Sequence, residues 1–264
     1  MSEPPVTQQR YAIGIEYDGS AHHGWQIQPH ASSIQQCLNQ ALSVVANCGV
    51  ECTGAGRTDT GVHASGQVAH FDSSAQRSIR SWLLGINSNL PDDISVQWVK
   101  PVAADFHARF SAIARSYRYV ILNRPVRSAV ERQFVWWINQ PLDHELMAQA
   151  AAYLVGEFDF TSFRASSCQA HSAVRTVSNL SVHRVADHIY IDCRANAFLH
   201  HMVRNLVGSL VRIGKREEEV SWIRQILESR DRKVSGMTAP ATGLTLTRVE
   251  YPAGALGEAP SSSD

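Results

Sequence analysis

The chain has 264 residues, 44% of them hydrophobic, and its 24 lysines and arginines balance 24 aspartates and glutamates. This length and apolar content support a sizeable buried core, and the sequence has no uninterrupted apolar run of about 18 residues, as a membrane helix needs. The start, MSEPPVTQQR, lacks the apolar core of a signal peptide, so we expect a soluble, cytoplasmic protein without a membrane partner.

The first half of the chain predicts strands and helices in turn. Residues 11–17 alternate like a strand and end in the turn signal Asp18-Gly19, and Ser33 is expected to cap an amphipathic helix over 34–45. Three further elements follow in the order strand, helix, strand: residues 66–72, 78–87 and 94–100. The order of this half is therefore βαβαβ-like.

The second half again mixes the two kinds of element. Residues 115–123 predict a strand, and 174–185 with 188–195 predict a β-hairpin. Helices are expected over 144–155 and 201–214. These patterns favour an α+β protein of two halves, each with helices on one face of a largely antiparallel sheet, over a doubly wound fold.

We place the two α+β domains at residues 10–107 and 108–251. The ends, 1–9 and 252–264, are rich in Pro, Ser, Gly and Ala and show no hydrophobic period, so they are expected to be disordered tails.

Basic residues are segregated along the chain although the formal net charge is zero. Two stretches without any acid, residues 106–130 and 193–216, each hold five lysines or arginines. All but three of the 24 basic residues are arginines, which suit phosphate contacts and base stacking. A genomic base composition that favours arginine codons explains this bias equally well.

The five cysteines include no C-x-x-C, so the sequence indicates neither a disulfide framework nor a structural zinc site. Of these, Cys168 alone has polar neighbours that suggest a functional role.

The segment GAGRTDTGVHA, residues 54–64, is the most unusual in the sequence, because glycines surround Arg57, Asp59 and His63. It predicts a loop built for close backbone placement, although an ordinary surface loop with an Asx-turn has similar residues. It matches neither a phosphate-binding P-loop nor a dinucleotide fingerprint. No recognised ligand spacing joins Asp59 and His63 to His200 and His201, so no metal site is predicted.

This segment closely resembles the active-site loop of the TruA family of tRNA pseudouridine synthases. Further segments match the family in the same order: YDGSAHHGWQIQP, DFHARFSAIARSYRY, FTSFRASSCQ, FLHHMVRNLVGSLVRIG and PATGLTLTRVEYP. The resemblance thus covers nearly all of the chain outside its ends.

The resemblance implies the pseudouridine synthase fold, with two ferredoxin/RRM-like halves joined around a central catalytic cleft. It also implies conversion of uridine to pseudouridine at positions 38, 39 and 40 of the tRNA anticodon stem-loop, without cofactor or metal. Members of the family are homodimers, and we expect the same here.

By the same resemblance, Asp59 is the catalytic carboxylate. Attack on C1′, addition to C6 and removal of a C2′ proton all remain open as its chemical route. Arg204 matches the arginine expected to pair with it, and a guanidinium favours an ionised carboxylate. Arg57 matches the arginine assigned to flipping the target nucleotide out of its stack.

Tyr117 matches the tyrosine that packs against the uracil, and Leu244 is a weaker candidate for the opposite wall of that pocket. Strand alternation places Tyr117 and Tyr119 on one face and Arg118 on the other, and Tyr119 is interpreted as a core residue. Candidates for tRNA contacts, by their place in the match, are His107, Arg109, Cys168, Gln169 and His171.

Three other functions compete with this one. They are a pseudouridine synthase that acts elsewhere in RNA, a catalytically silent RNA-binding protein, and a metal-dependent hydrolase that uses Asp59, His63 and His200. The presence of Asp59 argues against the second, and the family match makes the first the alternative.

Overall fold

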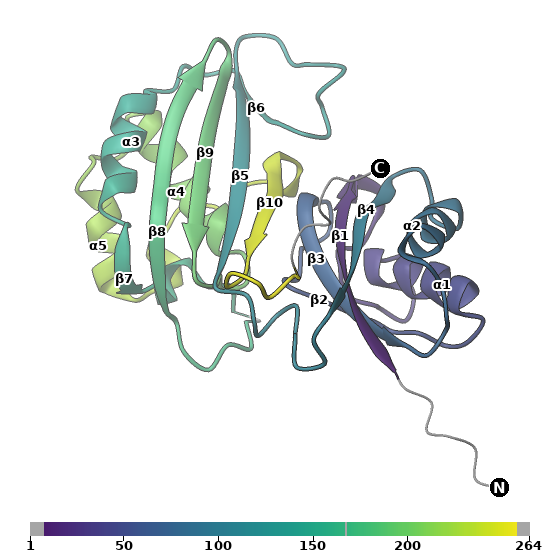
Figure 1. The fold of residues 1–264 in the computed structure, drawn as a ribbon. Helices are drawn as coiled ribbons and strands as arrows, with labels where there is room; N and C mark the ends of the chain where they lie inside the picture. Colours follow the sequence, from purple (N-terminus) through teal and green to yellow (C-terminus); the bar gives the residue numbers. More distant parts are fainter. Residues whose placement is uncertain (1–7, 167, 258–264) are drawn as a thin grey trace, which may run out of the picture. The chain divides into compact units, whose positions relative to one another are not determined.

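The computed structural model describes residues 8–166 and 168–257. The chain divides into two compact units. The first ends at Ile113 and takes up the chain again from Arg248, and the second comprises Ala114–Thr247. Each unit is mixed α and β (Figure 1).

The first unit has a central antiparallel sheet. Strand β1 (Gln9–Tyr17) lies between β3 (His63–Ser73) and β4 (Ile94–Val102), and the short β2 (Cys52–Gly54) pairs with β3. Helices α1 (Ile34–Ala46) and α2 (Ile79–Ser88) cover one face of this sheet (Figure 1). A single-turn 3-10 helix, η1 (Gly19–Ala21), follows β1.

Local sequence explains why α1 and α2 form where they do. The Ser33 hydroxyl accepts a hydrogen bond from the N–H of Gln36 at 3.3 Å, and Ser78 caps α2 in the same way through Ser81 at 3.1 Å. Residues of α1 at helical spacing are buried against the sheet, namely Ile34, Leu38, Ala41 and Leu42. Asn47, in the left-handed region at φ 57°, ends the helix.

The second unit is built on the antiparallel strands β5 (Ala114–Asn123), β9 (His188–Ala195), β8 (Val174–Val185) and β7 (Gly156–Asp159), in that spatial order. The short β6 (Trp136–Ile138) pairs with β5 in parallel, and β10 (Leu244–Glu250) also neighbours β5. Helices α3 (His144–Ala152), α4 (Met202–Gly214) and α5 (Trp222–Ser229) lie on one face (Figure 1). Three 3-10 turns complete it: η2 (Thr161–Phe163), η3 (Arg232–Val234) and η4 (Ala241–Gly243).

The predicted α+β class with mainly antiparallel pairing is confirmed, and the hairpin of β8 and β9 has the predicted bounds. Helix α3 is shorter than predicted, because it ends at Ala152 and not at residue 155. Helix α5, the seven-residue strand β10 and the short strands β2, β6 and β7 were not predicted. Strands of three or four residues have too few positions to show an alternation, so pairing with neighbours decides them.

The compact units differ from the domains expected at 10–107 and 108–251. The N–H of Ile113 donates to the carbonyl of Glu250 at 2.8 Å, and the Tyr251 hydroxyl donates to the carbonyl of Ala108 at 2.7 Å. The rings of Phe106 and Tyr251 also pack at 5.1 Å between centroids. These contacts bring the end of β10 back to the first unit.

Part of each expected tail is structured in the described residues. Gln9 already belongs to β1, and residues 252–257 form turns in which the N–H of Ala255 donates to Pro252 and that of Gly257 to Gly254, at 3.2 and 3.0 Å. The expectation for residues 1–7 and 258–264 lies outside the described residues.

None of the helices in the described residues has the length and apolar character that crossing a membrane requires.

Candidate active site

The loop that carries Arg57 and Asp59 connects β2 to β3 in the first unit. Just after β2, the N–H of Ala55 donates to the carbonyl of Val68 at 2.7 Å, and the Gln67 side chain donates to the carbonyl of Gly56, also at 2.7 Å. Strand β3 therefore holds the start of the loop by hydrogen bonds to two consecutive residues, Ala55 and Gly56.

Thr58 is the buried anchor of the loop. Its carbonyl accepts the N–H of Trp25 at 3.0 Å, and its hydroxyl lies 2.8 Å from the hydroxyl of Tyr17. Thr58 is 7% exposed, whereas Asp59 is half-buried and Arg57 is exposed. Thr58 is thus buried between two residues that are more exposed than it is.

The backbone of Asp59 is held as closely as that of Thr58. Its carbonyl accepts the N–H of Val62 at 3.1 Å, which closes a tight turn. Gly24 packs against the same stretch with φ +82°, and a Cβ built there would lie 2.5 Å from the Thr58 oxygen and 2.9 Å from the carbonyl carbon of Asp59. Only glycine fits such a close approach, so the YDGSAHHGW segment supports the loop from behind.

His63 braces the end of the loop where β3 begins. It is 2% exposed, and its Nδ1 lies 3.1 Å from both the N–H of Gly19 and the Asp18 carboxylate. Burial alone would raise the pKa of Asp18, but hydrogen bonds from Ser20 and the neighbouring His63 lower it overall. Asp59 lies in the loop and His63 is the first residue of β3, so the two do not share a helix face.

Tyr117 and Tyr119 lie on the same face of β5 in the second unit, as the alternation predicted. Tyr117 is 8% exposed, and its ring meets that of Phe198 edge-on at 5.0 Å. Tyr119 is fully buried, and its hydroxyl donates to the carbonyl of Pro240 at 2.8 Å. Arg118 points to the other face and pairs with Asp192 at 2.7 and 2.9 Å.

Arg204 lies in the first turn of α4, which follows the left-handed residue His201 at φ 61°. Its Nε donates to the carbonyl of Ala239 at 2.7 Å. Leu244 is the first residue of β10 and is 5% exposed. Tyr117, Arg204 and Leu244 thus belong to the second unit, and Arg57 and Asp59 to the first.

The five candidates for tRNA contacts fall into two loops. His107, half-buried, and Arg109, exposed, lie between β4 and β5 in the first unit. Cys168, half-buried, precedes the exposed Gln169 and His171 between η2 and β8 in the second. Burial would raise the pKa of the Cys168 thiol, but the N–H groups of Ala170 and His200, with Arg164, lower it.

The residues that hold the loop, above all Gly24, Tyr17 and Gln67, were not predicted from the sequence. Gly24 and Tyr17 both belong to the YDGSAHHGW segment, so the motif indicated this region but not what it contacts. Gln67 sits in a strand pattern as an inward-facing polar residue, which is the one local sign that it has a buried partner.

Comparison with known proteins finds the same family over most of the chain. Residues 13–111 and 150–252 match the sequence profile of a family described as tRNA pseudouridine synthase. A protein from Pseudoalteromonas atlantica named tRNA pseudouridine synthase A is 55% identical over 243 residues, 92% of each chain. Relatives of the same name from Hydrogenovibrio crunogenus and Klebsiella pneumoniae are 54% and 51% identical, and cover 91% and 96% of this chain and 92% and 93% of their own.

Proposed function

Because the chain belongs to the tRNA pseudouridine synthase family, and is therefore an isomerase that converts uridine to pseudouridine, we propose that its targets are positions 38, 39 and 40 of the tRNA anticodon stem-loop. We further propose Asp59 as the catalytic carboxylate. The observation that carries this is the way the loop holds Asp59, with its backbone fixed through Val62 and Gly24.

The reaction suits a single carboxylate. The N1–C1′ bond of the nucleotide breaks, C5 bonds to C1′, the proton on C5 is lost and N1 gains one, so the uracil that leaves C1′ rejoins it and there is no net oxidation or loss of a group. A positioned carboxylate can act in such a reaction as a nucleophile or as a base. A fixed backbone is important because a misplacement of about 1 Å costs on the order of a hundredfold in rate.

Four residues complete the proposed site. Exposed and two residues before Asp59, Arg57 supports the flipped nucleotide, since a stacked uridine is out of reach of any side chain. Arg204 is the guanidinium that keeps Asp59 ionised, and Tyr117 with Leu244 forms the walls around the uracil. The buried, apolar setting of Tyr117 and Leu244 suits contact with the faces of a planar base.

tRNA docking is proposed to rest on phosphate contacts by His107, Arg109, Cys168, Gln169 and His171. A-form RNA is read mainly by shape, which fits an enzyme that accepts several adjacent uridines. We also propose that the protein is a homodimer, that it acts in the cytoplasm and that it needs no cofactor or metal.

The test is pseudouridine mapping on tRNA that lacks the modification, with wild-type protein, Asp59→Asn and the control Asp92→Asn, whose side chain is exposed in a turn after α2. Wild type and Asp92→Asn should modify the anticodon stem-loop, and Asp59→Asn should not. Modification at another RNA site would contradict the proposed target, and an active Asp59→Asn would contradict the proposed residue.

A further inference from the structure

The loop between β4 and β5 holds a phenylalanine in solvent. Phe110 is 76% exposed, although burying a phenylalanine normally stabilises a protein. Single exposed apolar residues are common, so exposure alone indicates nothing. What sets Phe110 apart is how firmly its surroundings are fixed.

The side chains of His107 and Ser111 hold the turn around Phe110 by hydrogen bonds. Nδ1 of His107 accepts the N–H groups of Arg109 and Phe110 at 3.1 and 3.2 Å. Ser111 closes the turn on both sides, because its N–H donates to the carbonyl of His107 at 2.9 Å and its hydroxyl accepts the N–H of His107 at 3.0 Å. The orientation of Phe110 is therefore set before any ligand arrives.

Two further residues of the first unit, His70 and Tyr251, hold this turn through Ala108. Nδ1 of His70 accepts the N–H of Ala108 at 3.2 Å, and the Tyr251 hydroxyl donates to the carbonyl of the same residue. The rings of His70 and His107 lie 4.6 Å apart, and those of His107 and Phe110 lie 4.3 Å apart at 32°. Three rings thus lead from the buried His70 outward to the exposed Phe110.

A positive charge accompanies the exposed ring. The guanidinium of Arg109 lies 5.5 Å from the centroid of Phe110. A flat ring beside an arginine is the combination by which proteins hold single-stranded nucleic acid, with bases on the aromatic face and phosphates on the basic group.

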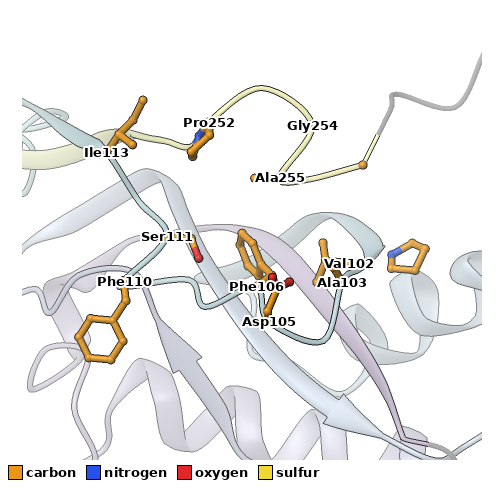
Figure 2. Close-up of a pocket in the computed structure, with 12 residues that line it drawn as sticks. Val102, Ala103, Asp105, Phe106, Phe110, Ser111, Ile113, Pro252, Gly254 and Ala255 are labelled. Carbon is orange, nitrogen blue, oxygen red and sulfur yellow. The ribbon is translucent and has the colours of Figure 1, made fainter.

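Phe110 borders an open hollow of about 730 Å³, whose other lining residues come from the end of β4, the loop that follows it and residues 252–257. In Figure 2 the ring of Phe110 extends away from the side on which Pro252 and Ala255 lie, whereas Phe106 packs below them. Phe110 thus borders the hollow and is still largely exposed to solvent.

We propose that Phe110 is a stacking residue for an unpaired base of the RNA substrate, with Arg109 beside it for a neighbouring phosphate. This inference rests on the proposed function, since it assumes that tRNA is bound. It adds a base contact to a docking mode otherwise made of phosphate contacts.

The experiment compares Phe110→Leu and Phe110→Trp with wild type in binding to an anticodon stem-loop RNA, by fluorescence anisotropy at one fixed salt concentration. Leucine keeps an apolar side chain and removes the ring, so affinity should fall by about tenfold, as expected for losing one stacked base. Tryptophan keeps the stacking face, so affinity should stay near that of wild type, and its added fluorescence should be quenched on binding. Leu84→Ala, at an exposed leucine of α2, is the matched control.

Three outcomes would overturn the inference: wild-type affinity in Phe110→Leu, equal losses in the leucine and tryptophan variants, or a change of oligomeric mass in Phe110→Leu by light scattering. The last would make the ring a contact between copies of the chain. Failure of the proposed function has a different signature. In that case the wild-type protein forms no pseudouridine in the anticodon stem-loop, while the affinities of the Phe110 series are still measurable.

Discussion

The Nε of Arg204 donates to the carbonyl of Ala239 at 2.7 Å, and the N–H of Ala239 donates back to the carbonyl of Arg204 at 3.1 Å. Ala239 is itself held on its N-terminal side, because the hydroxyl of Thr238 donates to the fully buried Asn205 at 2.7 Å. Arg232 donates to the same Asn205 oxygen at 3.0 Å. The direction of the Arg204 side chain thus depends on a buried polar network in the second unit.

We therefore expect Thr238→Val to lower kcat by about tenfold with little change in the KM for tRNA, because it loosens Ala239 and with it Arg204. The free energy of unfolding should fall by about 1 kcal/mol, since a part-buried hydrogen bond is lost. Thr238→Ser keeps the hydroxyl and should restore most of the activity. A loss of stability with unchanged kcat would show that the network is structural only.

Gly24→Ala should reduce both stability and activity. The alanine Cβ would lie 2.5 Å from the Thr58 oxygen at a φ of +82°, so the loop that carries Asp59 must shift. We expect a loss of about 1–3 kcal/mol in urea unfolding and a fall in kcat of at least tenfold. Gly49→Ala, where an added Cβ meets nothing within 4 Å, is the matched control. Similar behaviour of the two variants would contradict the role given to Gly24.

His70 should make the protein sensitive to acid. Burial, with His107 and Arg10 nearby, lowers the pKa of His70 from 6.5 to about 4. In the unfolded chain, His70 takes up a proton as the pH falls below about 6.5. In the native state it does so only near pH 4. The free energy of unfolding therefore holds above pH 6.5 and falls as the pH drops towards 4, by at most about 1.4 kcal/mol per pH unit from this residue.

His70→Asn, which keeps an acceptor for the N–H of Ala108, should flatten this dependence in urea unfolding between pH 7.5 and 4.5. His30→Asn, at an exposed histidine, should leave it as in wild type. If the three proteins lose stability in parallel, another group is responsible.

Arg109→Ala should weaken tRNA binding and lower the slope of log Kd against log salt by about 0.7–0.9, the value for one lost phosphate contact. Arg118→Gln replaces an arginine that is paired with Asp192 and should leave that slope unchanged. Equal slopes for wild type and Arg109→Ala would argue against a phosphate contact at this residue.

The sequence by itself determined the class of the fold, the elements with a clear period and the family. Strands such as 174–185 and helices such as 34–45 carry their periodicity and caps locally, so neighbouring residues suffice to predict them. The resemblance across nearly the whole chain indicated Asp59 and its loop without any knowledge of contacts.

Only the tertiary structure decided how that loop is held and where the chain ends belong. Gly24 meets Asp59, Asn205 meets Thr238, and Tyr251 meets Ala108 across long stretches of sequence. Such contacts depend on how strands and helices pack, and they leave no period or motif of their own. The same holds for Phe110. Its residue type is typical of a core, but it lies in the hydrogen-bonded turn at His107 and is exposed to solvent.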